Sequence, residues 1–333
     1  MRRSFRGKVV AITGASSGVG RAVARAFGKD GARVALIARN PEALVHAAEE
    51  IRRAGGDALV IAADVADARA VDAAAEEIVA RWGRLEVWVN NAMVSVLSPA
   101  LEMTPDEFQR VTEVTYLGYV HGTLAALRRM REQGGVVVQI GSALAYRSIP
   151  LQSAYCAAKA AIRGFTDSLR SELIHDRIPV KLCMIQLPAV NTPQFEVVRT
   201  RMPKRPMPVP PAYQPELIAR AVLRAAGRPS REVWLGWPTI KAIVGQFLAP
   251  GFADRYLARA AYDGQQTDQP VEENRPDNLF APVRGDRGAH GPFDSMARSR
   301  SVEMWLHAHR AWVAAGVAAA SLVTAAGLAR QRQ

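Results

Sequence analysis

Short, almost continuous apolar runs alternate with longer amphipathic stretches over the first 190 residues. The runs are built from Val, Ile, Leu and Ala and lack the alternating polarity of a sheet with one face in water. Such runs are typical of parallel strands that helices cover on both faces. We predict seven strands: Lys8–Thr13, Arg33–Ala38, Ala58–Ala63, Leu85–Asn90, Val136–Gly141, Val180–Leu187 and Glu232–Leu235.

Helical patterns separate these strands. The clearest are Val19–Lys29, Pro41–Ala54, Ala68–Trp82, Gln152–His175 and Gln214–Ala226. Regular alternation of strand and helix predicts an α/β fold, a doubly wound parallel sheet of the Rossmann type in a single domain. We assign residues 1–249 to this domain.

The amino-acid composition of the chain changes after Pro188. Six further prolines fall within Thr192–Tyr213, and because proline lacks a backbone donor and breaks helices, we predict a long lid or binding loop there. Residues 250–302 are rich in Gly, Pro, Asp, Asn and Gln with little periodicity. We interpret them as an irregular extension that wraps the domain surface.

Residues 303–333 form a third part, an Ala-rich segment predicted as a C-terminal helix. Ala311–Ala329 has 19 residues without a charge, between Arg310 and Arg330. A helix of that length rises about 28 Å, close to the hydrocarbon thickness of a bilayer. Nine of the 19 residues are alanine, which is only marginally apolar, so two alternatives stay open: a membrane anchor, which we favour, and a helix packed on protein. The N-terminus has no signal-peptide pattern, and we expect the body of the protein in the cytoplasm.

The chain is basic, with 43 Lys and Arg against 31 Asp and Glu and a formal charge of +12. A basic surface suits nucleic acid, anionic lipid or a phosphorylated cofactor. No zinc finger or aromatic RNA-binding motif accompanies it, so we expect no nucleic-acid partner. The only cysteines, Cys156 and Cys183, argue against a disulfide framework, and no Cys/His cluster has metal-site spacing, so we expect no metal.

A glycine-rich loop, Thr13–Gly20, joins the first predicted strand to the first predicted helix. Glycines in such a loop permit a tight turn, close approach of a pyrophosphate and close packing of helix on strand. The N-terminus of the following helix attracts phosphate. We therefore predict dinucleotide contacts from Gly14, Ser16, Ser17, Gly18, Val19 and Gly20.

The second and third predicted strands end in residues that suit the adenosine half of a dinucleotide. Arg39 stands where many NAD-specific proteins carry an acidic residue, and a guanidinium there suits a 2′-phosphate, so NADP(H) is preferred over NAD(H). The alternative is a solvent-facing arginine. Asp64, followed by Val65, is placed to accept a hydrogen bond from the adenine amino group, or alternatively to cap the next helix.

Tyr155 and Lys159 are four residues apart on one predicted helix and so share a face. A free phenol titrates near pH 10, and we predict that the neighbouring ammonium lowers the pKa of Tyr155 enough for acid–base catalysis. Ser142 follows the strand Val136–Gly141, and the active sites of parallel sheets lie at the carboxyl ends of strands. Its hydroxyl is placed to hold a substrate carbonyl beside Tyr155.

Four motifs with matching order and spacing make residues 6–237 resemble the short-chain dehydrogenase/reductase superfamily. They are Thr13–Gly20, Asn90-Asn91-Ala92, Ser142 and Tyr155-x-x-x-Lys159. The resemblance implies a Rossmann fold, a nicotinamide cofactor, and hydride transfer to or from a carbonyl or alcohol. It also implies that Tyr155 is the acid/base, that Lys159 lowers its pKa and binds the nicotinamide ribose, and that Ser142 orients the substrate.

Further roles follow from the resemblance. It carries the family asparagine onto Asn90 and implies a homodimer or homotetramer that pairs through the helix bearing Tyr155 and the helix before it. Two departures stand out: Met93 replaces a glycine, and Thr115 replaces the asparagine of a proton relay, with its hydroxyl predicted to hold the relay water. The implied cofactor contacts beyond the glycine loop are Asn91, Ala92, Tyr155, Lys159, Pro188, Val190 and Thr192.

The predicted function is NADP(H)-dependent hydride transfer with an apolar ketone, aldehyde or secondary alcohol as the small-molecule partner. Two rival hypotheses remain: a catalytically silent NADP(H)-binding regulatory or scaffold protein, and a nucleotide-sugar epimerase. The apolar substrate is inferred from the candidate pocket residues Met93, Val94, Val96, Leu97, Leu144, Ile149, Leu151, Phe195 and Met202.

Overall fold

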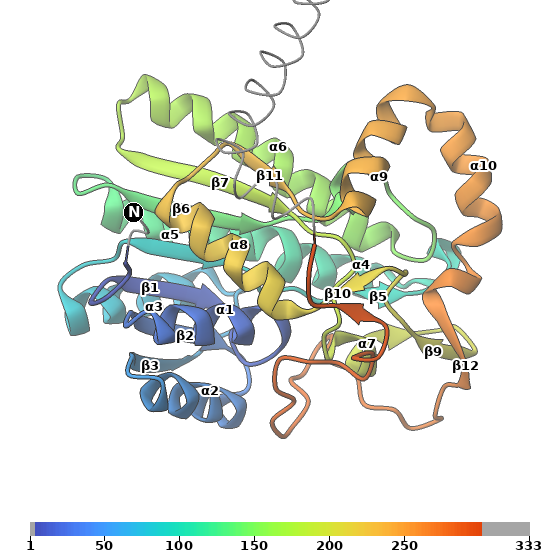
Figure 1. Cartoon of the computed structure of the whole chain (residues 1–333), viewed down its shortest axis with the longest axis horizontal. Coiled ribbons are helices and arrows are strands. Elements are labelled where there is room, and N and C mark those ends of the chain that lie inside the picture. Colours follow the sequence, from blue (N-terminus) through green and yellow to red (C-terminus); the bar gives the residue numbers. More distant parts are fainter. Residues whose placement is uncertain (1–3, 302–333) are drawn as a thin grey trace, which may run out of the picture.

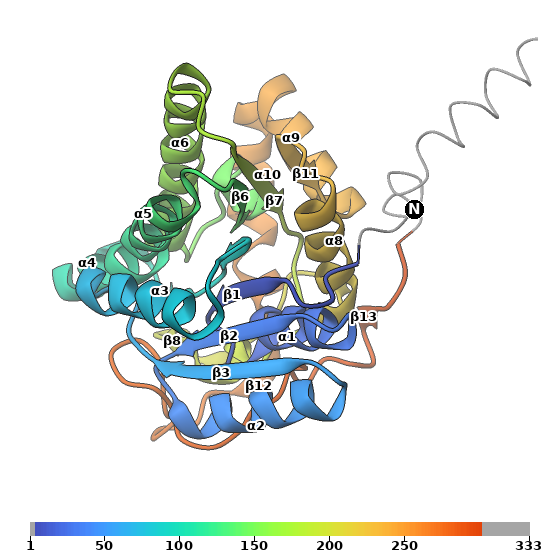
Figure 2. The ribbon, with the colours of Figure 1, turned by 90° about the vertical axis from the view of Figure 1, so that its left-hand side faces the viewer.

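The computed structural model describes residues 4–301. At its centre lies a parallel sheet of seven strands in the order β11-β7-β6-β4-β1-β2-β3. Helices cover both faces of this sheet, so the predicted doubly wound Rossmann-like fold in a single domain is confirmed (Figures 1 and 2). The strands of the sheet are β1 Val9–Thr13, β2 Arg33–Ala38, β3 Asp57–Ala62, β4 Val87–Asn90, β6 Gly135–Ile140, β7 Val180–Gln186 and β11 Glu232–Trp234.

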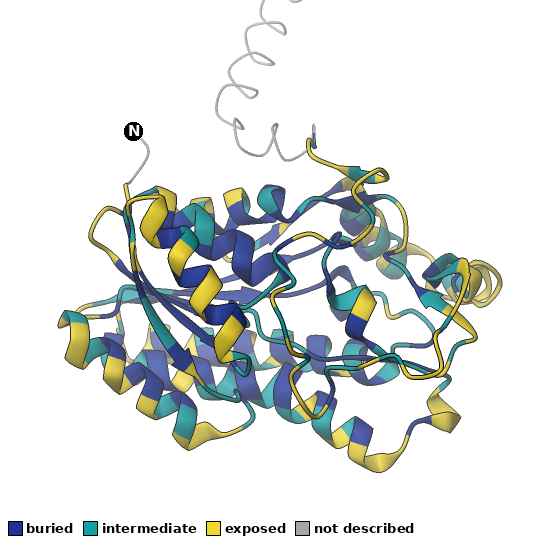
Figure 3. Ribbon diagram, turned by 90° about the horizontal axis from the view of Figure 1, so that it is seen from below, coloured by how far each residue is buried: buried dark blue, intermediate teal, exposed yellow. Residues whose placement is uncertain are grey.

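The core forms two layers, one on each side of the sheet. In β1, Val10 and Ile12 join the cluster that packs against α1 and α8, whereas Val9 and Ala11 join the cluster on the side of α3 and α5. Because successive strand side chains point to opposite faces, a strand covered on both faces favours apolar residues at most of its positions. Figure 3 shows the buried strands between the exposed outer faces of the helices. The long helices are α1 Gly18–Lys29, α2 Pro41–Arg53, α3 Ala68–Trp82, α4 Pro105–Thr112, α5 Gly118–Met130, α6 Ser153–His175, α8 Pro215–Gly227, α9 Trp237–Leu248 and α10 Pro250–Ala260.

The order of the strands in the sheet indicates where a ligand-binding crevice lies. Strand β1 lies between β2 and β4, so the chain moves outward from β1 in both directions along the sheet. Ligands of open α/β sheets bind at the carboxyl ends of strands beside such a switch point. The glycine loop after β1 and Asn91 after β4 both lie there.

The proline-rich loop contains more regular structure than we predicted. The short helix α7, Gln194–Val197, and three short strands fall within it, and each strand pairs with another part of the chain. Proline is compatible with short edge strands, which need few backbone donors. These elements are β8 Arg199–Thr200 paired with β5 Val96–Leu97, β9 Lys204–Pro206 paired with β12 Gln266–Pro270, and β10 Ala212–Tyr213 paired with β13 Ala297–Arg298.

The prediction of an irregular extension from residue 250 is wrong at its start. Residues 250–260 form the helix α10, which buries no residue. From residue 271 to β13 the chain is irregular, as predicted, and follows one side of the domain to reach β13 near α1 (Figures 1 and 2). The predicted C-terminal helix and possible anchor at 303–333 lie outside the described residues.

Short turns of other helix types connect the main elements. The π-helical turn at Glu113–Leu117 lies between α4 and α5, and a 3-10 turn at Ala143–Ala145 begins three residues after the end of β6. Two further 3-10 turns occupy Ala100–Glu102 and Asp263–Gln265. Among residues 4–301, no helix has the length and apolarity needed to cross a bilayer, and no group of three His, Cys, Asp or Glu side chains could hold a metal ion.

Candidate active site

A cavity of about 660 Å³ opens at the carboxyl ends of the central strands. It contains the glycine loop at one end and Ser142, Tyr155 and Lys159 at the other. Of the residues predicted for cofactor or catalysis, only Gly20 and Thr115 do not line it. Those that do are Gly14, Ser16, Ser17, Gly18, Val19, Arg39, Asp64, Val65, Asn91, Ala92, Ser142, Tyr155, Lys159, Pro188, Val190 and Thr192.

The glycine loop needs its glycines for backbone conformation and for space. Gly14 and Gly18 have φ of 66° and 57°, in the left-handed region that favours glycine. A Cβ on Gly14 would lie 2.8 Å from Cα of Ala92, and one on Gly20 would lie 2.1 Å from the carbonyl oxygen of Gly14. Gly20 thus lets α1 begin against the loop, which explains why it shapes the cavity without lining it.

Asn91 fastens the end of β4 to the glycine loop. Its Nδ2 donates to the carbonyl oxygens of Thr13 at 3.0 Å and Gly14 at 3.2 Å, and its backbone N–H donates to Oγ1 of Thr13 at 2.9 Å. Asn90, onto which the resemblance carries the family asparagine, makes its hydrogen bonds elsewhere. Asn90 is fully buried, and its Nδ2 donates to Gln139 and Thr123 inside the core.

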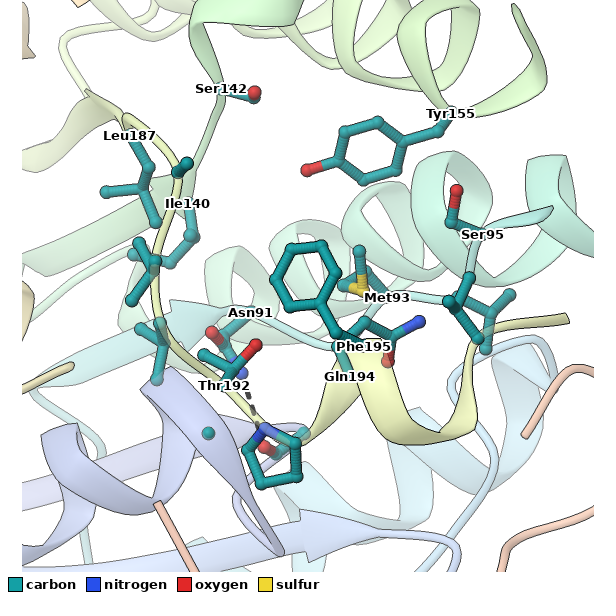
Figure 4. Close-up of a pocket in the computed structure, with 18 of the residues that line it drawn as sticks. Asn91, Met93, Ser95, Ile140, Ser142, Tyr155, Leu187, Thr192, Gln194 and Phe195 are labelled. Carbon is teal, nitrogen blue, oxygen red and sulfur yellow. Dashed lines mark hydrogen bonds between the residues drawn. The ribbon is translucent and has the colours of Figure 1, made fainter. Parts of the chain in front are cut away.

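Tyr155 and Ser142 come from different elements and face the same space. Tyr155 lies in the first turn of α6, Ser142 lies two residues after the end of β6, and both side chains point into the cavity (Figure 4). Burial raises the pKa of the Tyr155 phenol well above its usual value, and a hydrogen bond with Ser142 opposes that rise. The phenol is therefore protonated at neutral pH and ready to donate a proton.

Lys159 is buried one turn further along α6. Its Nζ donates to the carbonyl oxygen of Ile140 at 2.7 Å and to Oη of Tyr119 at 3.0 Å. Nζ also lies over the Tyr155 ring, 5.5 Å from its centroid. Burial lowers the pKa of Lys159 to about 7, so the ammonium is only partly populated at neutral pH.

The prediction that Lys159 lowers the pKa of Tyr155 stays a prediction, because the net rise in the pKa of Tyr155 has burial as its largest cause. Burial disfavours the charged forms of both groups, the phenolate of Tyr155 and the ammonium of Lys159. The sequence spacing correctly places both groups on one helix face, but the depth of that face below the surface depends on the whole fold.

Thr115, whose hydroxyl we predict to hold a relay water, does not line the cavity. Its hydroxyl donates to the carbonyl oxygen of Val94 at 2.8 Å and accepts from the Val94 backbone N–H at 3.1 Å, in a fully buried position within the π-helical turn. Tyr119 is the residue that sequence reasoning missed. Its Oη donates to the carbonyl oxygen of Ile140 at 2.9 Å and accepts from Lys159.

We predict that Tyr119→Phe lowers turnover about tenfold, because a hydrogen bond to a charged group contributes about 1.5–3 kcal/mol. Without the hydroxyl, the ammonium of Lys159 loses a hydrogen-bond acceptor, so the pKa of Lys159 falls. The limb of the kcat–pH profile that reports the titration of Lys159 therefore moves to lower pH. Tyr116→Phe, on the preceding turn and outside the cavity lining, is the matched control. A Tyr119→Phe profile that overlays the wild-type profile would contradict the positioning role.

The adenosine end of the cavity holds Arg39 and Asp64. Asp64 accepts from the Ala66 backbone N–H at 3.0 Å and pairs with Arg110 through its other oxygen. The alternative that Asp64 caps the next helix is wrong, because Asp67 is the N-cap of α3. The guanidinium of Arg39 is not simply in solvent, since burial lowers its pKa and it donates to three backbone carbonyls of residues 278–280.

The Tyr155 end of the cavity is mostly apolar. Met93 and Phe195 stand opposite Tyr155 across the open space (Figure 4). Six of the nine predicted pocket residues line the cavity, whereas Val96, Leu151 and Met202 do not. The proline-rich loop adds lining residues that the sequence did not single out: Pro206, Met207, Val209, Pro210 and Pro211.

Comparison with known proteins agrees with this geometry. Residues 8–202 match the model of the short chain dehydrogenase family. The chain is 33% identical over 304 residues to the uncharacterized oxidoreductase YxnA of Bacillus subtilis, covering 90% of this chain and 85% of that protein. It is 35% identical over 271 residues to dehydrogenase/reductase SDR family member 7B of Bos taurus, covering 78% and 83%.

A solved structure is similar as well. An alcohol dehydrogenase from the archaeon Thermococcus sibiricus, complexed with 5-hydroxy-NADP, superposes with a TM-score of 0.61 at 29% identity, covering 69% of this chain and 96% of that one. The chain therefore belongs to the short-chain dehydrogenase/reductase family and is an oxidoreductase of that family.

Proposed function

We propose that this protein is an NADP(H)-dependent reductase or dehydrogenase of apolar carbonyl compounds and the corresponding alcohols. The observation that carries the proposal is the single cavity that joins the phosphate-binding glycine loop to Ser142, Tyr155 and Lys159. The left-handed Gly14 and Gly18 and the start of α1 make a cradle that suits a pyrophosphate. When bound, the nicotinamide would supply the hydride.

The chain's own residues hold the substrate and move a proton. Ser142 donates a hydrogen bond to the substrate oxygen and holds it beside Oη of Tyr155. The raised pKa of Tyr155 keeps the phenol protonated, so it gives its proton to the oxygen of a carbonyl that is being reduced. Lys159, anchored by Ile140 and Tyr119, stabilises the phenolate that remains. The apolar lining excludes water and favours an apolar substrate.

The two rival functions are less well supported. A silent regulatory protein has no use for a serine, tyrosine and lysine that meet in one cavity, and an epimerase on a nucleotide-sugar suits a polar pocket better than this apolar one. We also propose a homodimer or homotetramer that pairs through α5 and α6, and a cytoplasmic location for the body of the protein.

The preference for NADP(H) rests on Arg39, which lines the cavity where the adenosine ribose would lie. We expect Arg39→Gln to weaken NADPH binding about tenfold and to leave NADH binding unchanged, because only NADPH carries the 2′-phosphate. Fluorescence titration of the purified full chain with each cofactor measures both constants, and the exposed Arg53→Gln is the control.

The same preparation then oxidises NADPH in the presence of apolar ketones and aldehydes in mild detergent. A chain that binds neither cofactor would overturn the proposed function. Equal losses of both cofactors in Arg39→Gln would overturn only the preference.

A further inference from the structure

Residues 278–294, here called the strap, run along the adenosine side of the cofactor cavity. At its first end, three carbonyl oxygens of the strap accept from Arg39: that of Asn278 at 2.5 Å, and those of Leu279 and Phe280 at 3.3 and 3.1 Å. The Leu279 side chain is fully buried in the core on the α3 side. This end is therefore fixed to the domain by both packing and hydrogen bonds.

The middle of the strap is tied to the start of α2 and to α1. Nδ2 of Asn40 donates to the carbonyl oxygens of Val283 at 2.9 Å and Gly285 at 3.2 Å. The carboxylate of Asp286 accepts from the fully buried guanidinium of Arg21 at 3.2 and 3.3 Å. These hydrogen bonds fix the middle of the strap against the start of α2 and against α1.

The last part of the strap reaches the glycine loop itself. The carbonyl oxygen of Gly288 accepts from the backbone N–H of Gly18, the first residue of α1, at 3.0 Å. Further on, a Cβ on Gly291 would lie 2.4 Å from the carbonyl oxygen of Thr192, so only glycine permits this approach. At the end of the strap, the carboxylate of Asp294 accepts a hydrogen bond from Nδ2 of Asn191 at 2.8 Å.

Arg287 lies between the two anchored residues Asp286 and Gly288 and lines the cavity. Its Nε is buried and has no hydrogen-bond partner, and its guanidinium has no carboxylate partner, within residues 4–301. Arg284, three residues earlier, is exposed and does not line the cavity. Arg287 is half-buried as a residue, and because its guanidinium is always charged, a cavity-lining position without a carboxylate partner favours an anionic partner from outside the chain.

The charges around the cavity point to the same kind of partner. The cavity is lined by five arginines and lysines but by one carboxylate, Asp64, which already pairs with Arg110. Arg147 is likewise paired, with Asp254. An anion between Arg287, the start of α1 and Arg39 would meet both positive side chains and backbone donors.

We propose that Arg287 is a cofactor ligand that binds a phosphate group of the dinucleotide, so that the strap completes a two-sided phosphate site. The proposal rests on the proposed function, since it assumes a dinucleotide in this cavity. The glycine loop binds the phosphates from one side, and the strap brings a second arginine to them from a segment about 270 residues later in the chain.

The test compares Arg287→Gln with Arg284→Gln in the full chain, with NADPH and NADH titrated by fluorescence. We expect Arg287→Gln to raise the Kd for NADPH at least tenfold and Arg284→Gln to change it less than twofold. An equal loss for NADH assigns the pyrophosphate to Arg287, and a loss confined to NADPH assigns the 2′-phosphate. Either result supports the proposal.

Thermal unfolding without cofactor checks that the strap stays in place. If Arg287→Gln lowers the Tm, Arg287→Met, which keeps the packing of the stem, is scored by the same titration. Wild-type affinity for both cofactors in the folded variant would overturn the role of Arg287 and leave the proposed function intact. A wild-type chain that binds neither cofactor would overturn the proposed function, and the role of Arg287 with it.

Discussion

Tyr155→Phe should lower kcat about 10²–10⁴-fold, the range that a positioned acid or base contributes, and leave the Kd for NADPH within about twofold of wild type. The substitution removes the hydroxyl that we propose as the proton donor to the substrate oxygen and keeps the ring that lines the cavity. Burial raises the pKa of this phenol. The substitution also removes a buried polar hydroxyl, whose burial costs free energy, so we expect the Tm to be unchanged or slightly higher.

The measurement is NADPH oxidation with the best substrate of the carbonyl panel, followed by cofactor titration of the same samples. Tyr262→Phe, at a half-exposed tyrosine outside the cavity lining, is the control for loss of a phenol elsewhere. Turnover retained by Tyr155→Phe would show that another group supplies the proton. Loss of cofactor binding together with turnover would show that Tyr155 acts mainly as a cofactor contact.

The sequence predicts the central fold well because each strand is encoded by its own residues. All seven strands of the sheet begin and end within two residues of their predicted limits. The long helix that carries Tyr155 and Lys159 was predicted as Gln152–His175 and is observed as Ser153–His175. The strands can be recognised in the sequence because both faces of the sheet are buried, which favours apolar residues at most positions of each strand.

Predictions that depend on a side chain's direction were less successful. Asn90 and Asn91 are neighbours at the end of a strand, so they point to opposite sides, and only Asn91 reaches the glycine loop. Thr115 lies in a π-helical turn, which rotates its hydroxyl toward the Val94 backbone. Tyr119 follows four residues after Thr115, and that spacing was the one signal that could have indicated it.

The strap could not be predicted because its contacts join residues that are far apart in the sequence. Arg39 and Asn278 are separated by 239 residues. The guanidinium of Arg39 donates to the backbone carbonyl oxygen of Asn278, a group that any residue supplies. Neither periodicity nor composition records such a contact. The pKa of Lys159 has the same origin, since the depth of burial that lowers it comes from the whole fold.

Lys159→Met should abolish turnover and raise the stability of the cofactor-free protein at pH 6. Burial lowers the pKa of Lys159 from 10.5 to about 7, so the folded state binds this proton less readily than the unfolded state. Between pH 7 and about 10 the unfolded chain holds a proton that the folded chain has released, and wild-type stability therefore rises with pH through this window. Below pH 7 the wild type carries a buried ammonium, and its removal should contribute about 1–3 kcal/mol.

Urea unfolding of wild type and Lys159→Met at pH 6, 8 and 10 measures this difference. We expect the variant's advantage to be largest at pH 6 and to shrink by pH 10, with Lys181→Met, at an exposed lysine of β7, showing no such trend. A variant less stable than wild type at pH 6, with no dependence on pH, would mean that the contacts of Nζ with Ile140 and Tyr119 outweigh the cost of burial. A more stable Lys159→Met variant would support the proposed role of Lys159 in the reaction, because a lysine that lowers stability is then kept beside Tyr155 where a methionine of similar volume folds better.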